Sequence, residues 1–151
     1  MTKKKKVLAV ASGGGHWVQL MRLKTAFQDA DVVYMSTNSS FAIDVPGARL
    51  VTVPDANIWE KVAMVKMFAA VFFRVAMIRP DVVVTTGAAP GLSALMVGKL
   101  FGARTMWIDS IANSEQLSGS GKVARHFADV WLTQWEHLAA DSGPQYWGGV
   151  L

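Results

Sequence analysis

The chain has 151 residues, of which 52% are apolar and 17% charged, with a net charge of +4 and no cysteine. This length suits one domain with a proper core and is too short for two, so we expect a single domain over residues 1–151. The lack of cysteine excludes disulfides and thiolate metal sites, and the sequence shows no other metal-binding cluster. So much apolar surface with so few charges favours a protein that contacts a partner, a membrane or both.

The N-terminus carries four lysines at positions 3–6. The apolar run behind them, residues 7–11, is too short for the hydrophobic region of a signal peptide, so we expect it to enter a strand. The lysines either form a solvated tail or attract anionic lipid head groups, at about 1 kcal/mol for each lysine near the surface. No basic stripe with interleaved aromatic residues follows, which argues against a nucleic-acid partner.

Strand-like and helix-like patterns alternate along the chain. In chain order they predict a strand over 6–11, a helix over 16–27, strands over 31–36 and 49–53, and a helix from a cap at Asp55 or Asn57 to about residue 78. They continue with a strand over 81–85, a helix over 90–101, a strand over 104–108, a helix over 118–127, a strand over 129–133 and a last helical turn over 136–140. This alternation is typical of an α/β fold with a Rossmann-like, doubly wound parallel sheet.

Two glycine-rich loops follow predicted strands, at residues 12–16 and 85–91. Both therefore lie at the carboxyl edge of the sheet, where such folds bind ligands. Glycine lets backbone N–H groups approach an anion closely, and a helix N-terminus adds partial positive charge. The loops thus predict a phosphate or diphosphate site with His16 at its lip.

Two common phosphate ligands do not fit this loop. In a dinucleotide fingerprint a third glycine would stand at Val18, and an acidic residue would end the second strand, where this chain has Ser36. A Walker loop is also absent, because no Gly-Lys-Ser/Thr follows the glycines.

Ser-Gly-Gly-Gly-His at 12–16 and Thr-Gly-Ala-Ala-Pro-Gly at 86–91 resemble the acceptor half of GT-B glycosyltransferases, such as the lipid-linked muropeptide N-acetylglucosaminyltransferase. Four later runs are similar to a narrower family. That family comprises the membrane-associated subunit of the eukaryotic split transferase that adds the second GlcNAc to dolichol diphosphate, and its bacterial capsule and exopolysaccharide counterparts. The runs are residues 107–112, 118–122, 128–136 and 146–149, so the resemblance spans nearly the whole chain.

The resemblance implies half of a split enzyme, with the fold of a GT-B N-terminal domain. A separate glycosyltransferase chain would bind the UDP-sugar and form a heterodimer with this one, which would bind no cofactor itself and have little or no activity alone. The acceptor would be a polyprenyl-diphosphate-linked saccharide in capsule or exopolysaccharide synthesis. Length agrees, because a complete two-domain transferase needs roughly twice as many residues.

This sequence departs from the family in two respects. The eukaryotic subunit carries an N-terminal transmembrane helix and this sequence shows none, which favours the bacterial branch and peripheral attachment to the cytoplasmic face of the inner membrane. The family commonly has Glu-Ser where this chain has Asp109-Ser110, and a basic residue where it has Asn113.

His16 is the candidate catalytic residue. It either donates a hydrogen bond to the diphosphate or takes a proton from the acceptor hydroxyl, a role that suits histidine; capping the helix is the simpler alternative. The residues expected to hold the diphosphate are Ser12, Gly13, Gly14, Gly15, His16, Thr86, Gly87, Ala88 and Gly91. For Gly87 and Gly91, close packing of helix on strand is the competing explanation.

Four polar residues that follow later strands are candidates for contact with the acceptor sugar or the partner: Asp109, Ser110, Gln134 and Glu136. Capping of a helix is the alternative for the first two. Ordinary surface exposure is the alternative for the last two.

The predicted helix over 62–78 has seventeen residues and is interrupted by Lys66 and Arg74, so it falls short of the ~20 apolar residues of a membrane span. It is either a buried crossover helix or a surface helix that lies on a membrane. We expect the second, with membrane contacts from Trp59, Lys66, Phe68, Phe72, Phe73 and Arg74.

Two rival functions remain at this stage. One is a non-enzymatic membrane scaffold for a complete transferase. The other is a stand-alone enzyme that binds a nucleotide or a sugar phosphate.

Overall fold

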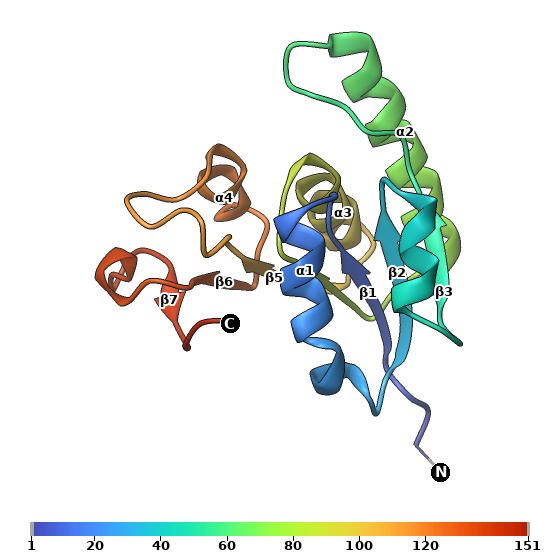
Figure 1. Ribbon diagram of the computed structural model, residues 1–151, viewed down its shortest axis with the longest axis horizontal. Coiled ribbons are helices and arrows are strands. Elements are labelled where there is room, and N and C mark those ends of the chain that lie inside the picture. The colour runs from blue at the N-terminus through green and yellow to red at the C-terminus, as the bar shows by residue number, and fades with distance from the viewer. Residues whose placement is uncertain (1, 151) are drawn as a thin grey trace.

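The computed structural model describes residues 2–150. Across these residues one parallel sheet forms with the strand order β3-β2-β1-β4-β5-β6-β7 (Figure 1). The strands are β1 (Lys6–Val10), β2 (Asp31–Ser36), β3 (Arg49–Thr52), β4 (Val82–Thr85), β5 (Arg104–Ile108), β6 (Val130–Thr133) and β7 (Gln145–Tyr146). The order reverses between β1 and β4, which is where doubly wound sheets open a crevice for ligands. The predicted α/β class and parallel sheet are confirmed.

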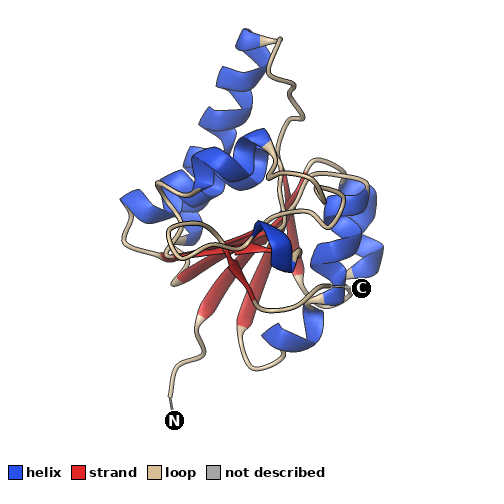
Figure 2. Cartoon of the chain, turned by 90° about the vertical axis from the view of Figure 1, so that its left-hand side faces the viewer, coloured by secondary structure: helices blue, strands red, loops and turns tan. Residues whose placement is uncertain are grey.

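Helices cover both faces of this sheet (Figure 2). They are α1 (Gly15–Arg22), α2 (Lys61–Ile78), α3 (Ala89–Leu100) and α4 (Gly119–Ala124), with the 3-10 helices η1 (Lys24–Phe27), η2 (Ser39–Asp44) and η3 (Glu136–Leu138).

The alternation of side chains along β1 divides the core. Leu8 and Val10 point to the face covered by α2, α3 and α4, whereas Ala9 points to the face covered by α1. Helix α3 lies close to the sheet because its inner face is built of small residues. A Cβ on Gly98 would come within 2.6 Å of Val83 Cγ2.

Three helix boundaries differ from the predictions by three or more residues. Helix α1 ends at Arg22 instead of residue 27, because the chain tightens into η1 after Leu23. Helix α2 begins at Lys61 without a side-chain cap, so neither Asp55 nor Asn57 caps it; their carboxylate and amide oxygens accept from backbone N–H groups inside the preceding loop. The predicted helix over 118–127 is shorter, ending at Ala124. The end of α2 before Pro80 is as predicted.

Two elements were not predicted. The 3-10 helix η2 forms after Asn38, whose side chain accepts a hydrogen bond from the Ser40 N–H. Strand β7 has only two residues and extends the sheet beside β6. Both segments are too short to show a hydrophobic period.

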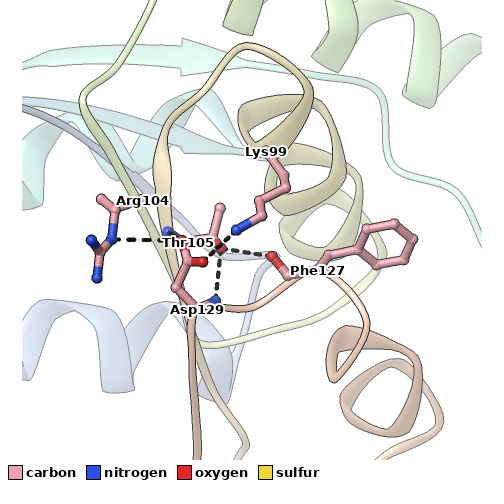
Figure 3. A network of polar contacts seen from close by, with 5 residues as sticks. All are labelled: Lys99, Arg104, Thr105, Phe127 and Asp129. Carbon is pink, nitrogen blue, oxygen red and sulfur yellow. Dashed lines mark hydrogen bonds and ion pairs between the residues drawn. The ribbon is translucent and has the colours of Figure 1, made fainter.

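A polar network ties the amino ends of β5 and β6 to the end of α3 (Figure 3). The Asp129 carboxylate accepts from the Thr105 N–H at 2.9 Å and pairs with the ammonium group of Lys99. Thr105 Oγ1 donates to the Phe127 carbonyl at 2.6 Å. The ion pair with Lys99 lowers the pKa of the Asp129 carboxyl below its ordinary value, although burial of the carboxyl acts to raise that pKa.

Helix α2 extends beyond the rest of the domain at its N-terminal end, as both views show (Figures 1 and 2). Among residues 2–150, no helix has the combination of length and apolarity that crossing a membrane requires.

Candidate functional site

Three hydrogen bonds join the two glycine-rich loops at the carboxyl edge of β1 and β4. The Ser12 N–H donates to the Gly87 carbonyl at 3.2 Å, and Thr86 Oγ1 donates to the His16 carbonyl at 2.7 Å. The His16 ring completes the set, with Nδ1 2.9 Å from the Thr86 carbonyl oxygen. The predicted proximity of the two loops is therefore correct.

The contact with Thr86 fixes the tautomer of His16. A carbonyl oxygen can only accept, so Nδ1 carries the hydrogen and donates it. In the neutral ring Nε2 then holds the lone pair, and it makes no hydrogen bond to any residue within 2–150. His16 is thus arranged to accept a proton, or to donate to an anion once it is protonated.

Glycine is required in these two loops for different structural reasons. Gly14 has φ +65°, and a Cβ on Gly13, Gly14 or Gly15 would meet no atom closer than 3.9 Å, so this loop is open in front of its backbone. Gly87 has φ +120°, and a Cβ there would lie 2.7 Å from His16 Nδ1. Gly91 is buried, and its Cβ would lie 2.0 Å from Thr85 Oγ1, which gives its small size a packing reason.

A cleft of about 730 Å³ begins at His16, Thr86 and Gly87. Its walls are mostly apolar and come from α2, α3 and α4 together with the chain just before α2. These wall residues are Ile58, Met64, Met67, Phe68, Leu92, Met96 and Val123. The volume is in the range of small-molecule sites.

A buried carboxylate organises the loop that follows β5. The Asp109 side chain accepts from Trp107 Nε1 at 3.0 Å, from Asn113 Nδ2 at 3.3 Å and from both the N–H and Oγ of Ser118, at 3.0 and 2.6 Å. A Cβ on Gly121 would lie 2.3 Å from Asp109 Oδ1, so glycine is needed there. Asp109 therefore lines the cleft as a residue that holds the 109–118 loop in place.

A second buried network connects α1 to the ends of β5 and β6. Gln19 Nε2 donates to Ser110 Oγ at 3.0 Å, and Gln134 Nε2 donates to Gln19 Oε1 at 2.6 Å and to the Asp109 carbonyl at 2.9 Å. The Val150 N–H donates to Gln134 Oε1 at 2.7 Å. Sequence reasoning missed Gln19, which stands two positions from Trp17 and therefore lies on another side of α1, so the helical pattern gave no signal that it is buried.

The structure places the predicted site residues in four settings. His16, Thr86, Gly87, Ala88, Asp109 and Ser110 line the cleft. Ser12, Gly13, Gly14 and Gly15 form the adjoining open loop, whereas Gly91 and Gln134 are buried in packing and Glu136 is exposed on η3. Within residues 2–150 no three His, Asp or Glu side chains gather as a metal site would require.

The predicted membrane residues divide between the two sides of α2. Trp59 is 86% exposed and Phe73 65% exposed, and Lys66 and Arg74 are exposed between and beside them. Phe72, one residue before Phe73, is half-buried and packs against Phe101 with ring centroids 5.8 Å apart. Phe68 is 39% exposed and lines the cleft.

Comparison with known proteins identifies relatives by sequence. The family described as "Oligosaccharide biosynthesis protein Alg14 like" matches residues 25–151. The UDP-N-acetylglucosamine transferase subunit ALG14 of Homo sapiens is 26% identical over 170 residues, which cover 87% of this chain and 76% of that protein. Its counterpart in Eremothecium gossypii is 35% identical over 80 residues, 48% of this chain and 35% of that protein.

Solved structures show the same fold at low identity. MurG of Acinetobacter baumannii superimposes with a TM-score of 0.76 at 13% identity, covering 93% of this chain and 44% of MurG. A putative UDP-N-acetylglucosamine 2-epimerase from Listeria monocytogenes gives 0.66 at 11% identity, with 88% and 40% covered. The chain thus spans less than half of each of these two structures and has the fold of a GT-B N-terminal domain.

Proposed function

The chain belongs to the Alg14-like family of oligosaccharide biosynthesis proteins, and from this premise we propose that it is the acceptor-binding subunit of a two-chain, UDP-sugar-dependent glycosyltransferase. Its acceptor is a polyprenyl-diphosphate-linked saccharide, made for capsule or exopolysaccharide. A second chain binds the UDP-sugar, and the heterodimer works at the cytoplasmic face of the membrane. Both relatives carry the name of a transferase subunit, which supports a division of the enzyme between two chains.

The observation that carries the proposal is the fixed orientation of His16. Nδ1–H is held by the Thr86 carbonyl, which leaves Nε2 as the atom available to a ligand in the cleft. In the transfer step the acceptor hydroxyl oxygen attacks C1 of the donor sugar, and the bond from C1 to the UDP oxygen breaks with its electrons leaving on UDP. The hydroxyl proton passes to His16 Nε2, which serves as general base.

The acceptor diphosphate is placed beside this histidine by the two loops. Helices α1 and α3 both begin there, so backbone N–H groups and helix dipoles favour an anion between them. The loop of Gly13, Gly14 and Gly15 leaves open space in front of its backbone, as close approach of a phosphate requires.

The membrane contact is an exposed apolar stripe along α2, defined as Val62, Val65, Ala69, Phe73 and Met77. The spacing of three and four residues puts these positions on one side of the helix. The opposite side is filled by the core residues Met67, Val71, Val75 and Ile78, so the stripe is additional to the core face. Lys66, on the same side of the helix as the stripe, and Arg74 at its edge suit anionic lipid phosphates.

The test is transfer of label from UDP-sugars to extracted lipid-linked acceptor. The assay compares this chain alone, a candidate donor-binding chain alone, the pair, and pairs carrying His16→Ala or the conservative His16→Gln. We expect activity only in the pair, and a fall in kcat of about 10²- to 10⁴-fold without the imidazole base. The rise of kcat with pH that a histidine base gives should disappear with it.

Two outcomes would overturn the proposal. Full activity of the donor-binding chain alone would reduce this chain to a scaffold. Unchanged kcat in the His16→Ala pair would remove the general base.

A further inference from the structure

The apolar part of the cleft is larger than a diphosphate and a histidine need. Beyond His16, Thr86 and Gly87 it runs between the first half of α2 and the facing sides of α3 and α4. None of the described residues lining it is lysine or arginine. Its one carboxylate, Asp109, has its oxygens occupied by Trp107, Asn113 and Ser118, so the cleft presents no free charge to a ligand.

Three methionines, Met64, Met67 and Met96, contribute to these walls. Methionine is unbranched and flexible, and its side chain adapts to irregular apolar ligands. A wall of this kind suits a branched hydrocarbon chain better than a sugar, which needs fixed hydrogen-bond partners.

The cleft reaches the exposed apolar surface of α2. Ile58 and Phe68 line it and are also 69% and 39% exposed, and Val65 of the membrane stripe, three residues before Phe68, borders Phe68 on the helix surface. The polar end, by contrast, belongs to loops at the carboxyl edge of β1 and β4. The cleft is therefore amphiphilic, with an anion-binding end and an apolar end that opens beside the stripe.

We propose that this cleft binds the first isoprene units of the acceptor's prenyl chain and draws them out of the bilayer between α2 and α3. The inference rests on the proposed function, because it takes the diphosphate at His16 as the start of the chain. The apolar end then binds the prenyl tail, so the subunit selects the acceptor by this tail as well as by its diphosphate.

The experiment measures binding of methyl, geranyl and farnesyl diphosphate to the full chain by calorimetry, in detergent-free buffer below micelle-forming concentrations. We expect farnesyl diphosphate to bind at least about tenfold more tightly than methyl diphosphate, because each isoprene unit buries apolar area. Val123→Trp fills the cleft from α4, so it should abolish this preference and leave the affinity for methyl diphosphate unchanged. Val18→Trp is the matched control, since Val18 on α1 is 50% exposed against 44% for Val123 and lies outside the cleft.

His16→Ala separates this inference from the proposed function. It should abolish transfer but leave the ratio of the three affinities unchanged, because the imidazole lies at the polar end of the cleft and is the base of the transfer step. Equal affinity for the three ligands, with binding of methyl diphosphate retained, would overturn the prenyl site alone. A length preference that survives Val123→Trp would also overturn the prenyl site, because the tail would then bind elsewhere. A preference that vanishes when the donor-binding chain is added would overturn it too, because the partner would then occupy the cleft. A length preference sensitive to Val123→Trp but joined to no transferase activity would support the cleft and refute the proposed function.

Discussion

The close approach of Gly87 to His16 makes a prediction that a double-mutant cycle can test. In Gly87→Ala the new Cβ would lie 2.7 Å from His16 Nδ1 and 2.8 Å from Cε1, so the ring must move away from the Thr86 carbonyl. The backbone at φ +120° adds strain of about 1–3 kcal/mol for a residue with a Cβ. Overpacking against the ring adds a further ~1–3 kcal/mol.

The same substitution should be milder where the ring is absent. In a His16→Ala background only the backbone strain remains. The loss of unfolding free energy caused by Gly87→Ala should therefore be smaller there than in the parent, by at least about 1 kcal/mol. Urea unfolding of the four proteins measures this coupling. Gly14→Ala is the control, because φ +65° strains the backbone while the open space around its Cβ gives no clash, and its effect should add to that of His16→Ala.

The reasoning fails if the two substitutions are additive within about 0.5 kcal/mol. Additivity would mean that the ring does not lie against Gly87, and the argument for a fixed His16 tautomer would fall with it. If Gly87→Ala does not fold alone, recovery of folding in the double mutant gives the same answer.

Three further predictions concern the rest of the domain. Because the contact with Lys99 lowers the pKa of Asp129, its carboxylate stabilises the fold fully above the ordinary range of an aspartate and ceases to do so as pH falls through the lowered folded-state value. Asp129→Asn should therefore cost about 1 kcal/mol at pH 7, and urea unfolding in increasingly acidic buffer should show the difference fading. Gln19→Leu removes one of the two buried acceptors of the Gln134 amide, which keeps the Asp109 carbonyl, and should cost about 1–3 kcal/mol, with faster hydrogen exchange at the Val150 amide. Phe73→Gln should reduce sedimentation with anionic vesicles by about tenfold without changing the urea midpoint, since the ring is exposed; unchanged sedimentation would remove the stripe from the membrane contact.

The sequence was sufficient to predict the sheet and the meeting of the two glycine-rich loops. Buried parallel strands are continuous apolar runs, as at 81–85, and the loops that follow such strands must share one edge. The pairing of His16 with Thr86 extends that reasoning across seventy positions, because β1 and β4 are neighbours at the switch point.

The buried polar networks could not be predicted in the same way. Gln134 follows a strand and is a polar residue of a type usually found at the surface. It is nevertheless only 5% exposed, because Gln19 of α1, 115 positions away, packs against it. No local period indicates such a pairing. The same limit applies to Phe72 and Phe73, because α2 is apolar on more than one side. Only the contact between Phe72 and Phe101 decides that the Phe72 ring is the covered one.

The topology bears on the proposal that the α2 stripe and His16 serve one reaction. Helix α2 is the crossover from β3 to β4, so it must begin near the carboxyl edge of the sheet and run about 27 Å back along it. Its exposed start at Val62, with Ile58 and Trp59 in the chain just before it, is therefore on the same edge as the loop that carries His16. Had the exposed apolar residues been confined to the end of α2 near Met77, a lipid-anchored diphosphate would have had to cross the length of the sheet to reach the imidazole. Under the proposed function, their presence at the start of the helix would give a short path from the bilayer to Nε2, as an acceptor embedded by its own tail would require.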